Sequence, residues 1–350
     1  MKKYLLPNDV NWYRANFHCH TVNSDGAYTP EKVKEVYKSH GYSIVAYSDH
    51  EILLDHSYLN DDEFLALTSC EYSVTESSPS FPQIFGVDKD NWSRAKCVHL
   101  NIFAKDPHNT FQPATDIECI AWLRGGYFKD KVKCDGYKRV YSREGINEII
   151  KRCNDAGFLV QLNHPYWSLN EREDYINMEG LWGLEILNYA TELETGSEYC
   201  PYIYDDMIRN GMFNLVCTMG DDNHNHGDSI RESFGGSTFI GARELKYDQV
   251  FEAMEKGHIY CASGRDNPPQ FKALYVEDNK IVIDCTPVES IFINGYGRSD
   301  RHITNDGTEG ITHAEFPLCK SDVYFRVTLR DRFGNNAHTH TYFVKDYIEE

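Results

Sequence analysis

The chain has 350 residues and a formal net charge of −19, from 35 Lys and Arg against 54 Asp and Glu. Such an acidic surface repels polyanions, and no basic run suited to a nucleic-acid backbone occurs, so we expect no long nucleic-acid partner. No apolar run reaches the roughly 18 residues that span a bilayer. The N-terminal stretch has too few apolar residues for a secretory segment. We therefore expect a cytoplasmic protein with no membrane partner.

Short apolar runs alternate with helical segments from residue 16 to about residue 260. The stretch 29–31, Thr-Pro-Glu, opens a helix as an N-cap, a first-turn proline and an early acid. Residues 142–157 and 247–257 have the i, i+3, i+4 spacing of amphipathic helices. The alternation predicts a parallel sheet with helices outside it. Seven strands are expected, which favours a barrel, and they are residues 17–20, 43–47, 66–73, 97–104, 158–163, 183–188 and 214–219.

Two other parts of the chain have a different pattern. Residues 104–141 lack clear periodicity, and we interpret them as an insertion or a loop near the barrel mouth. After about residue 265, the breaker cluster GRDNPP is followed by short alternating runs such as FKALYVED, KIVIDC and VYFRVTLRD. These runs predict a small antiparallel β-sandwich. The predicted domains are therefore residues 1–265 and 266–350.

Polar side chains come at the ends of most of the seven strands. His18 and His20 lie one residue apart, so on an extended strand both imidazoles point to the same side, and Cys19 points to the other. In parallel barrels, functional groups gather at the carboxyl ends of the strands. The candidates at that rim are His18, His20, Asp25, Asp49, His50, Glu71, His99, His164, Asp222 and His224.

Each of these residues, taken alone, is better explained as a surface, hydrogen-bonded or ion-paired side chain. Gathered at one rim, carboxylates and imidazoles are costly to desolvate and repel one another, and a bound cation removes that cost. Imidazole and carboxylate ligands without a well-placed thiolate suit zinc, manganese or iron. A catalytic zinc ion typically has three protein ligands, so the number of candidates indicates two to three divalent ions.

The ordered motifs resemble those of the polymerase and histidinol phosphatase (PHP) superfamily. They are FHCHTVNSDG, VAYSDHE, the strand that carries Glu71, VHLNIF, LNHP and GDDNH, and they cover about residues 16–262. EKGHIYCASG and YFRVTLRDRFGNNAHTHTYFV look like the two-domain branch with a C-terminal β-domain, which includes carbaryl-hydrolase-like members. The resemblance implies a distorted seven-stranded (β/α) barrel. Ser48, Glu51 and Asp221 depart from the residues usual in the family.

The resemblance also implies three sets of metal ligands. They are His18, His20, Glu71 and Asp222 for the first ion, Glu71 as a bridge with His99 and His164 for the second, and Asp25, His50 and His224 for the third. Metal coordination lowers the pKa of bound water towards 7, which would supply a bridging hydroxide as the attacking group. The residual positive charge of such a centre favours a dianionic phosphate monoester.

We therefore expect a metal-dependent phosphoesterase for a small phosphorylated substrate, with Glu71, Asp222 and His224 in the catalytic centre. Arg231 and Asp221 are the candidate substrate-binding residues. A carboxyl-ester, carbamate or amide hydrolase that uses the same metal centre stays open as an alternative. So does a non-catalytic metal-binding module whose β-domain binds a partner. The sequence is also compatible with a homo-oligomer.

Overall fold

The computed structural model describes residues 2–76, 95–121, 123–298 and 301–348. Its larger sheet begins with seven strands in the spatial order β10-β9-β8-β5-β4-β3-β2. In chain order these strands are β2 (Asn11–Asn16), β3 (Ile44–Tyr47), β4 (Leu65–Thr75), β5 (Cys97–Ala104), β8 (Phe158–Leu162), β9 (Gly183–Asn188) and β10 (Val216–Gly220). Six of the seven overlap the predicted ranges. The first strand ends at Asn16, so the prediction of a strand at 17–20 is wrong.

The direction of β5 differs from the prediction. β2, β3 and β4 pair in parallel, and so do β8, β9 and β10. β5 is antiparallel to both of its neighbours, β4 and β8, so the prediction of a wholly parallel sheet is wrong at this strand. The sheet consists of two parallel blocks joined through one reversed strand.

The two ends of this seven-strand stretch approach each other beyond β2 and β10. The backbone N–H of Asp222 donates to the carbonyl of His18 at 2.9 Å, and the N–H of His20 donates to the carbonyl of Asn223 at 3.2 Å. Cys19 and Asn223 form a single parallel bridge. The hydrogen-bonded strand order of the whole sheet is nevertheless an open path, so the closed barrel stays a prediction.

The larger sheet continues from β2 into the C-terminal part of the chain. β11 (Gly236–Ala242) pairs with β2, and β12 (Ile259–Ser263) pairs with β11. Neither strand was predicted. The path then runs through β19 (Asn336–Thr339), β18 (Tyr324–Arg330), β15 (Ser290–Gly295) and β16 (Arg301–Thr304), while β20 (Tyr342–Phe343) pairs with β18.

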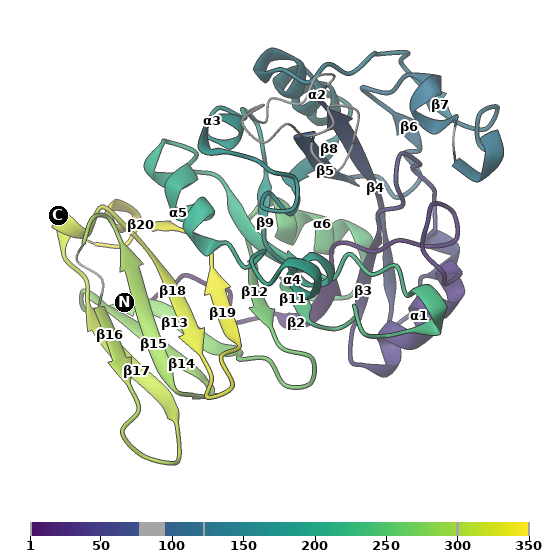
Figure 1. The fold of residues 1–350 in the computed structure, drawn as a ribbon. Helices are drawn as coiled ribbons and strands as arrows, with labels where there is room; N and C mark the ends of the chain where they lie inside the picture. The colour runs from purple at the N-terminus through teal and green to yellow at the C-terminus, as the bar shows by residue number, and fades with distance from the viewer. Residues whose placement is uncertain (1, 77–94, 122, 299–300, 349–350) are drawn as a thin grey trace.

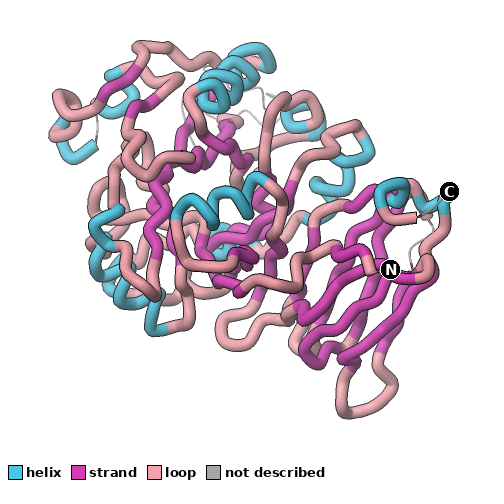
Figure 2. The backbone as a smooth tube through the Cα atoms, turned by 180° about the vertical axis from the view of Figure 1, so that it is seen from behind, coloured by secondary structure: helices cyan, strands magenta, loops and turns pink. Residues whose placement is uncertain are grey.

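A second, antiparallel sheet covers this C-terminal part. Its order is β1 (Lys3–Tyr4), β13 (Phe271–Glu277), β14 (Lys280–Val288) and β17 (Ile311–Pro317). Leu274 and Ile283 of this sheet share one buried core with Ile291 and Val327 of the larger sheet. The two layers form a sandwich at one end of the molecule (Figures 1 and 2). The domain boundary at residue 265 stays a prediction, because N-terminal β1 pairs with β13.

The predicted helices are confirmed, and two of them begin at a side-chain cap, of which the one at Thr29 was predicted. Thr29 accepts a hydrogen bond from the N–H of Lys32, and Ser142 accepts one from the N–H of Gly145. The helices are α1 (Pro30–Ser39), α2 (Arg143–Asp155), α3 (Arg172–Tyr175), α4 (Tyr189–Thr195), α5 (Pro201–Arg209) and α6 (Tyr247–Glu255). Figure 2 shows them around the larger part of the molecule. None of the helices in the described ranges combines the length and apolarity needed to cross a bilayer.

The irregular stretch 104–141 folds over β4. It contains the short parallel pair β6 (Phe111–Gln112) and β7 (Lys133–Cys134) and two 3₁₀ turns, Ile117–Ile120 and Leu123–Gly126. Arg139 is buried and its guanidinium lies 2.6 Å from the carboxylate of Glu51. The remaining 3₁₀ turns are Ser57–Leu59, His226–Asp228, Lys320–Asp322 and Val344–Asp346.

Candidate metal centre

The predicted ligands converge at one edge of the larger sheet. Most of them follow the carboxyl end of a parallel strand, as expected. His99 reaches the same edge for a different reason, because it is the third residue of the reversed strand β5. The structure brings together His18, His20, Asp25, His50, Glu71, His99, His164, Asp222 and His224.

Glu71 lies at the centre of the cluster and is completely buried. Its Oε1 is 3.2 Å from His18 Nε2, and its Oε2 is 3.0 Å from His50 Nδ1. Oε1 is also 3.1 Å from His99 Nδ1 and 3.1 Å from His164 Nε2. One carboxylate therefore faces imidazoles on both of its oxygens, which is the arrangement needed to bridge two ions.

Two other carboxylates complete the cluster. Asp222 Oδ1 is 2.8 Å from His20 Nε2. Asp25 is 3.5 Å from His224 Nε2 and 3.6 Å from His50 Nε2, and it is the most solvent-exposed of the three acids. Three groups have ligand atoms within 4.8 Å of one another, and they are His18, His20, Glu71 and Asp222; His50, Glu71 and His99; and His20, Asp25, His50 and His224.

These groups agree with the implied ligand sets except in two places. The first group is the same as the implied first set. The third group has His20 in addition. In the second group His50 stands in place of His164, although His164 also faces the Glu71 carboxylate. No cysteine belongs to any group found among the described residues.

The hydrogen-bonding state of these side chains fits a metal centre. Buried atoms without a hydrogen-bond partner include His18 Nε2, both ring nitrogens of His20, Glu71 Oε2 and Asp222 Oδ1. Buried polar atoms are normally paired, so a gathering of such atoms needs an explanation. Imidazole nitrogens and carboxylate oxygens are the ligands that zinc, manganese and iron accept.

Without a bound ion, the carboxylates of the cluster favour protonation of the neighbouring imidazoles. Burial alone would lower the pKa of His18, but the carboxylates of Asp222, Glu71 and Glu185 raise it well above its usual value. Burial likewise opposes the protonation of His224, but the Asp25 carboxylate raises its pKa to about 9. Metal binding has to displace these protons, so the metal affinity should fall as the pH falls.

Residues behind the cluster fix its geometry. Glu185 Oε1 lies 3.1 Å from His18 Nδ1, which leaves Nε2 facing Glu71. The side-chain amide of Asn188 donates to Glu185 at 2.9 Å and to Asp222 at 3.1 Å. Asp49 does not face the cluster; its Oδ1 accepts hydrogen bonds from the backbone N–H groups of Thr21 and Ser24 and so holds the turn that leads to Asp25.

The two predicted substrate-binding residues lie elsewhere. Asp221 is fully buried and accepts hydrogen bonds from the N–H of Phe234 at 2.6 Å, the N–H of Gly236 at 2.8 Å and the Tyr37 hydroxyl at 2.8 Å. Its carboxylate therefore supports the backbone instead of facing a substrate. Arg231 is exposed and does not line the cavity described below.

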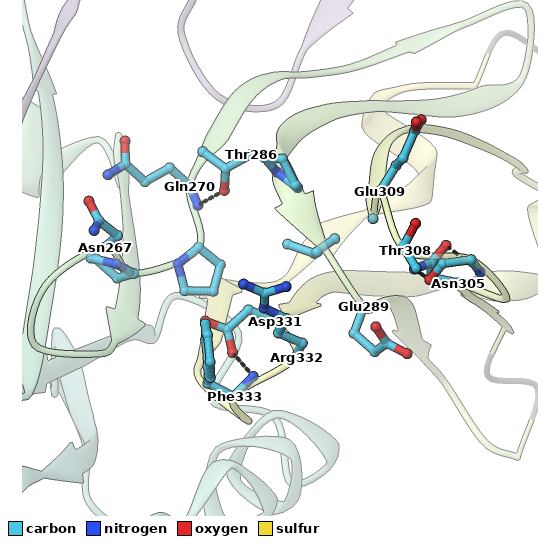
Figure 3. Close-up of a pocket in the computed structure, with 16 residues that line it drawn as sticks. Asn267, Gln270, Thr286, Glu289, Asn305, Thr308, Glu309, Asp331, Arg332 and Phe333 are labelled. Carbon is cyan, nitrogen blue, oxygen red and sulfur yellow. Dashed lines mark hydrogen bonds between the residues drawn. The ribbon is translucent and has the colours of Figure 1, made fainter.

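A cavity of about 390 Å³ opens over the cluster. Its described lining includes no Lys or Arg, and it adds Glu194, Glu232 and His226 to the predicted ligands. Trp167 forms part of the lining, with its ring centroid 5.5 Å from that of His99 and 5.2 Å from that of His164. A larger cavity of about 620 Å³ lies between loops of the sandwich, and its described lining has no His or Cys (Figure 3).

Sequence reasoning missed several supporting residues. Asn163 donates to Glu71 Oε1 at 2.9 Å, Ser168 Oγ lies 3.1 Å from His164 Nδ1, and buried Glu198 accepts hydrogen bonds from the backbone beside Trp167. Asn163 belongs to the LNHP motif and Ser168 follows it by three residues, so their proximity to His164 was visible in the sequence. Glu198 had no such signal, because its partners are backbone N–H groups more than 30 residues away.

No known family profile and no curated protein matches the chain. Several solved structures are similar to it, and three of them are as follows. A two-domain protein from Bacteroides vulgatus, described as containing a predicted PHP-like metal-dependent phosphoesterase, is 12 % identical over 97 % of both chains, with a TM-score of 0.45. A protein from Bifidobacterium adolescentis named as a metal-dependent phosphoesterase is 21 % identical over 61 % of this chain and 88 % of its own, with a TM-score of 0.36.

The third similar structure is an amidohydrolase from Chromobacterium violaceum with bound sulfate and no metal. It is 14 % identical over 70 % of this chain and 96 % of its own, with a TM-score of 0.41. At these identities and TM-scores, a functional inference has to rest on the side-chain geometry. The structural neighbours of this chain include a two-domain PHP-like protein, from the superfamily that its sequence motifs resemble.

Proposed function

We propose that this protein is a metal-dependent hydrolase that cleaves phosphoesters of small molecules. The observation that carries the proposal is the set of buried, unpartnered imidazole and carboxylate atoms around Glu71 beneath an open cavity. Nine side chains offer enough ligand atoms for two to three divalent ions of zinc, manganese or iron. When bound, such ions lower the pKa of a coordinated water and offset the charge of a phosphoryl group.

Individual residues of the site would have different roles. Glu71 fixes the spacing of two ligand groups, because its two oxygens face different imidazoles. Glu185 orients the His18 ring through Nδ1, which leaves Nε2 free to act as a ligand. Asp25 and Trp167 both line the cavity, so a bound substrate would meet an acid and an aromatic ring.

A second candidate is a carboxyl-ester, carbamate or amide hydrolase that uses the same centre. It is favoured by the cavity lining, in which the described residues include no Lys or Arg to hold a phosphate. Glu194 and Glu232 add negative charge instead. With such a lining, only the ions and the histidines would attract an anionic substrate.

The test is a metal analysis combined with hydrolysis assays of the purified protein. We would measure ions per chain and the rates on an aryl phosphate monoester, an aryl phosphodiester and an aryl carboxylate ester. His20→Ala removes a buried candidate ligand, and His108→Ala is the matched control, because His108 is exposed and its ring pairs with Asp55 away from the cluster.

The phosphoesterase proposal would be supported by two to three bound ions and phosphatase activity in the wild type. His20→Ala should lose metal and activity, and His108→Ala should keep them. Bound ions with carboxyl-esterase activity alone would favour the second candidate. A protein that binds no ion, and gains no activity from added manganese or zinc, would refute both.

A further inference from the structure

The turn after β8, residues 164–168, carries three groups of the centre. His164 Nε2 faces Glu71 Oε1 at 3.1 Å, and Ser168 Oγ lies 3.1 Å from the other ring nitrogen of the same histidine. Trp167 lines the cavity. His164 has a φ of 22°, a value that is rare for a residue with a side chain. Outside contacts must therefore hold this turn in place.

One buried carboxylate provides such contacts. Pro165 has no N–H, and the N–H of Ser168 donates to the carbonyl of His164 within the turn. The N–H groups of Tyr166 and Trp167 both point to Glu198, where they donate to Oε1 at 3.2 Å and to Oε2 at 2.8 Å. Glu198 lies between α4 and α5 and has no solvent exposure.

Burial of a carboxyl group at this position has a large desolvation cost. Glutamate is rarely fully buried without a charged partner, and no ion pair to Glu198 occurs among the described residues. Burial raises its pKa to about 8, against the effect of the two N–H donors. Packing alone would be served by a neutral side chain. The N–H groups of Tyr166 and Trp167 reach different oxygens of Glu198, and a carboxyl group offers one acceptor oxygen to each.

We propose that Glu198 is a positioning residue that holds the 164–168 turn, and through it sets the affinity of the ion at His164 and the place of the Trp167 wall. The proposal rests on the proposed function for its metal readout, but not for its structural one. In Glu198→Gln the amide offers one acceptor oxygen and presents NH₂ to the second N–H, so one backbone hydrogen bond is lost.

The experiment compares Glu198→Gln with Glu192→Gln. Glu192 lies nearby on α4 and also accepts one backbone hydrogen bond, from Tyr199, and it acts on Glu198 through its charge. We would titrate the metal-free proteins with zinc chloride in a calorimeter. Separately, we would measure amide hydrogen exchange of a peptide that covers residues 163–170 by mass spectrometry.

The Glu198→Gln protein should bind one of its ions about 10- to 100-fold less tightly, which is the usual effect of a lost outer-shell partner. Exchange in residues 163–170 should be faster, and the control should match the wild type in both measurements. Ser168→Ala should be non-additive with Glu198→Gln and additive with Glu192→Gln, because the first pair acts through the same histidine.

Unchanged zinc affinity with unchanged exchange in Glu198→Gln would overturn the proposal. If the wild type binds no zinc or manganese, the proposed function fails, and the exchange measurement alone then decides the role of Glu198. If Glu198→Gln does not fold, Glu198→Asp is used instead, because it keeps the carboxyl group but shortens the reach. Normal exchange of the turn in that variant would also refute the proposal.

Discussion

Glu71 is the residue on which the two innermost ligand groups depend. Glu71→Gln keeps the size of the side chain and an acceptor for the Asn163 amide but removes the negative charge that faces five imidazoles. We expect the purified variant to lose at least one ion per chain and at least about 100-fold in hydrolytic rate, with an unchanged far-UV circular dichroism spectrum.

Glu63→Gln is the control for this substitution, because Glu63 is exposed and paired with Lys38 on the surface. The Glu63→Gln protein should keep the metal content and the hydrolytic rate of the wild type. A Glu71→Gln protein with full metal content and a wild-type rate would show that this carboxylate is not a ligand.

Asp221 and Asp222 are neighbours in the sequence with opposite roles in the structure. Asp221→Asn cannot accept all three hydrogen bonds, so a buried donor is left unpaired, at a cost of about 1–3 kcal/mol in the free energy of unfolding. Metal content should stay the same. Asp222→Asn should lose metal, because its Oδ1 faces His20. Urea unfolding of the metal-free proteins measures the first effect, and metal analysis of the purified proteins measures the second. Loss of metal in Asp221→Asn with full metal content in Asp222→Asn would contradict this assignment.

At the scale of elements, the contact between β10 and β11 leaves no room for a side chain. A Cβ at Gly236 would lie 2.4 Å from the carbonyl oxygen of Gly220, and backbone atoms cannot move aside without separating the strands. Gly236→Ala should therefore lower the free energy of unfolding by about 2–3 kcal/mol. Gly307→Ala is the control, because the nearest atom to its Cβ would be 3.8 Å away. Equal urea midpoints for the two variants would contradict the expected clash.

Strand direction is the element property that periodicity could not predict. The range 97–104 was predicted with its observed bounds, because six of its eight residues are apolar or small and mark a strand locally. Its reversal against β4 and β8 depends on which strands it meets and how the chain returns. His99 was thus predicted at the correct edge of the sheet, although it lies near the amino end of β5 and not near the carboxyl end.

At the scale of the whole molecule, His340 packs where the C-terminal segment meets the larger part. Its ring lies close to Gly257, which follows α6, and 4.6 Å from the ring of Tyr342. Burial lowers the pKa of His340 to about 4. The unfolded chain takes up this proton near pH 6.5 and the folded chain only near pH 4, so stability falls as the pH drops through that window.

The expected loss from this histidine is about 2 kcal/mol between pH 7.5 and pH 5. His340→Gln should remove that part of the pH dependence. This pH dependence is measured by urea unfolding of the wild type and His340→Gln in the presence of a chelator. Both proteins are then metal-free, so protonation of the metal ligands contributes equally to each. An equal pH dependence for variant and wild type would show that His340 titrates alike in the folded and unfolded chains.

The sequence by itself determined the features that depend on short stretches of chain. The cap at Thr29 begins its helix as predicted, because a cap bonds to an N–H three residues away. The chemical types at the strand ends, His, Asp and Glu, indicated a metal centre, and the structure brings those nine residues together.

Tertiary structure decided the features that depend on residues far apart in the chain. The direction of β5, the pairing of β11 with β2 and the turning of Asp221 away from the cavity all follow from partners that no local pattern names. Glu198 is the extreme case, because it recognises two backbone N–H groups, which every residue except proline carries. A contact of that kind leaves no trace in the sequence, and only the folded chain shows it.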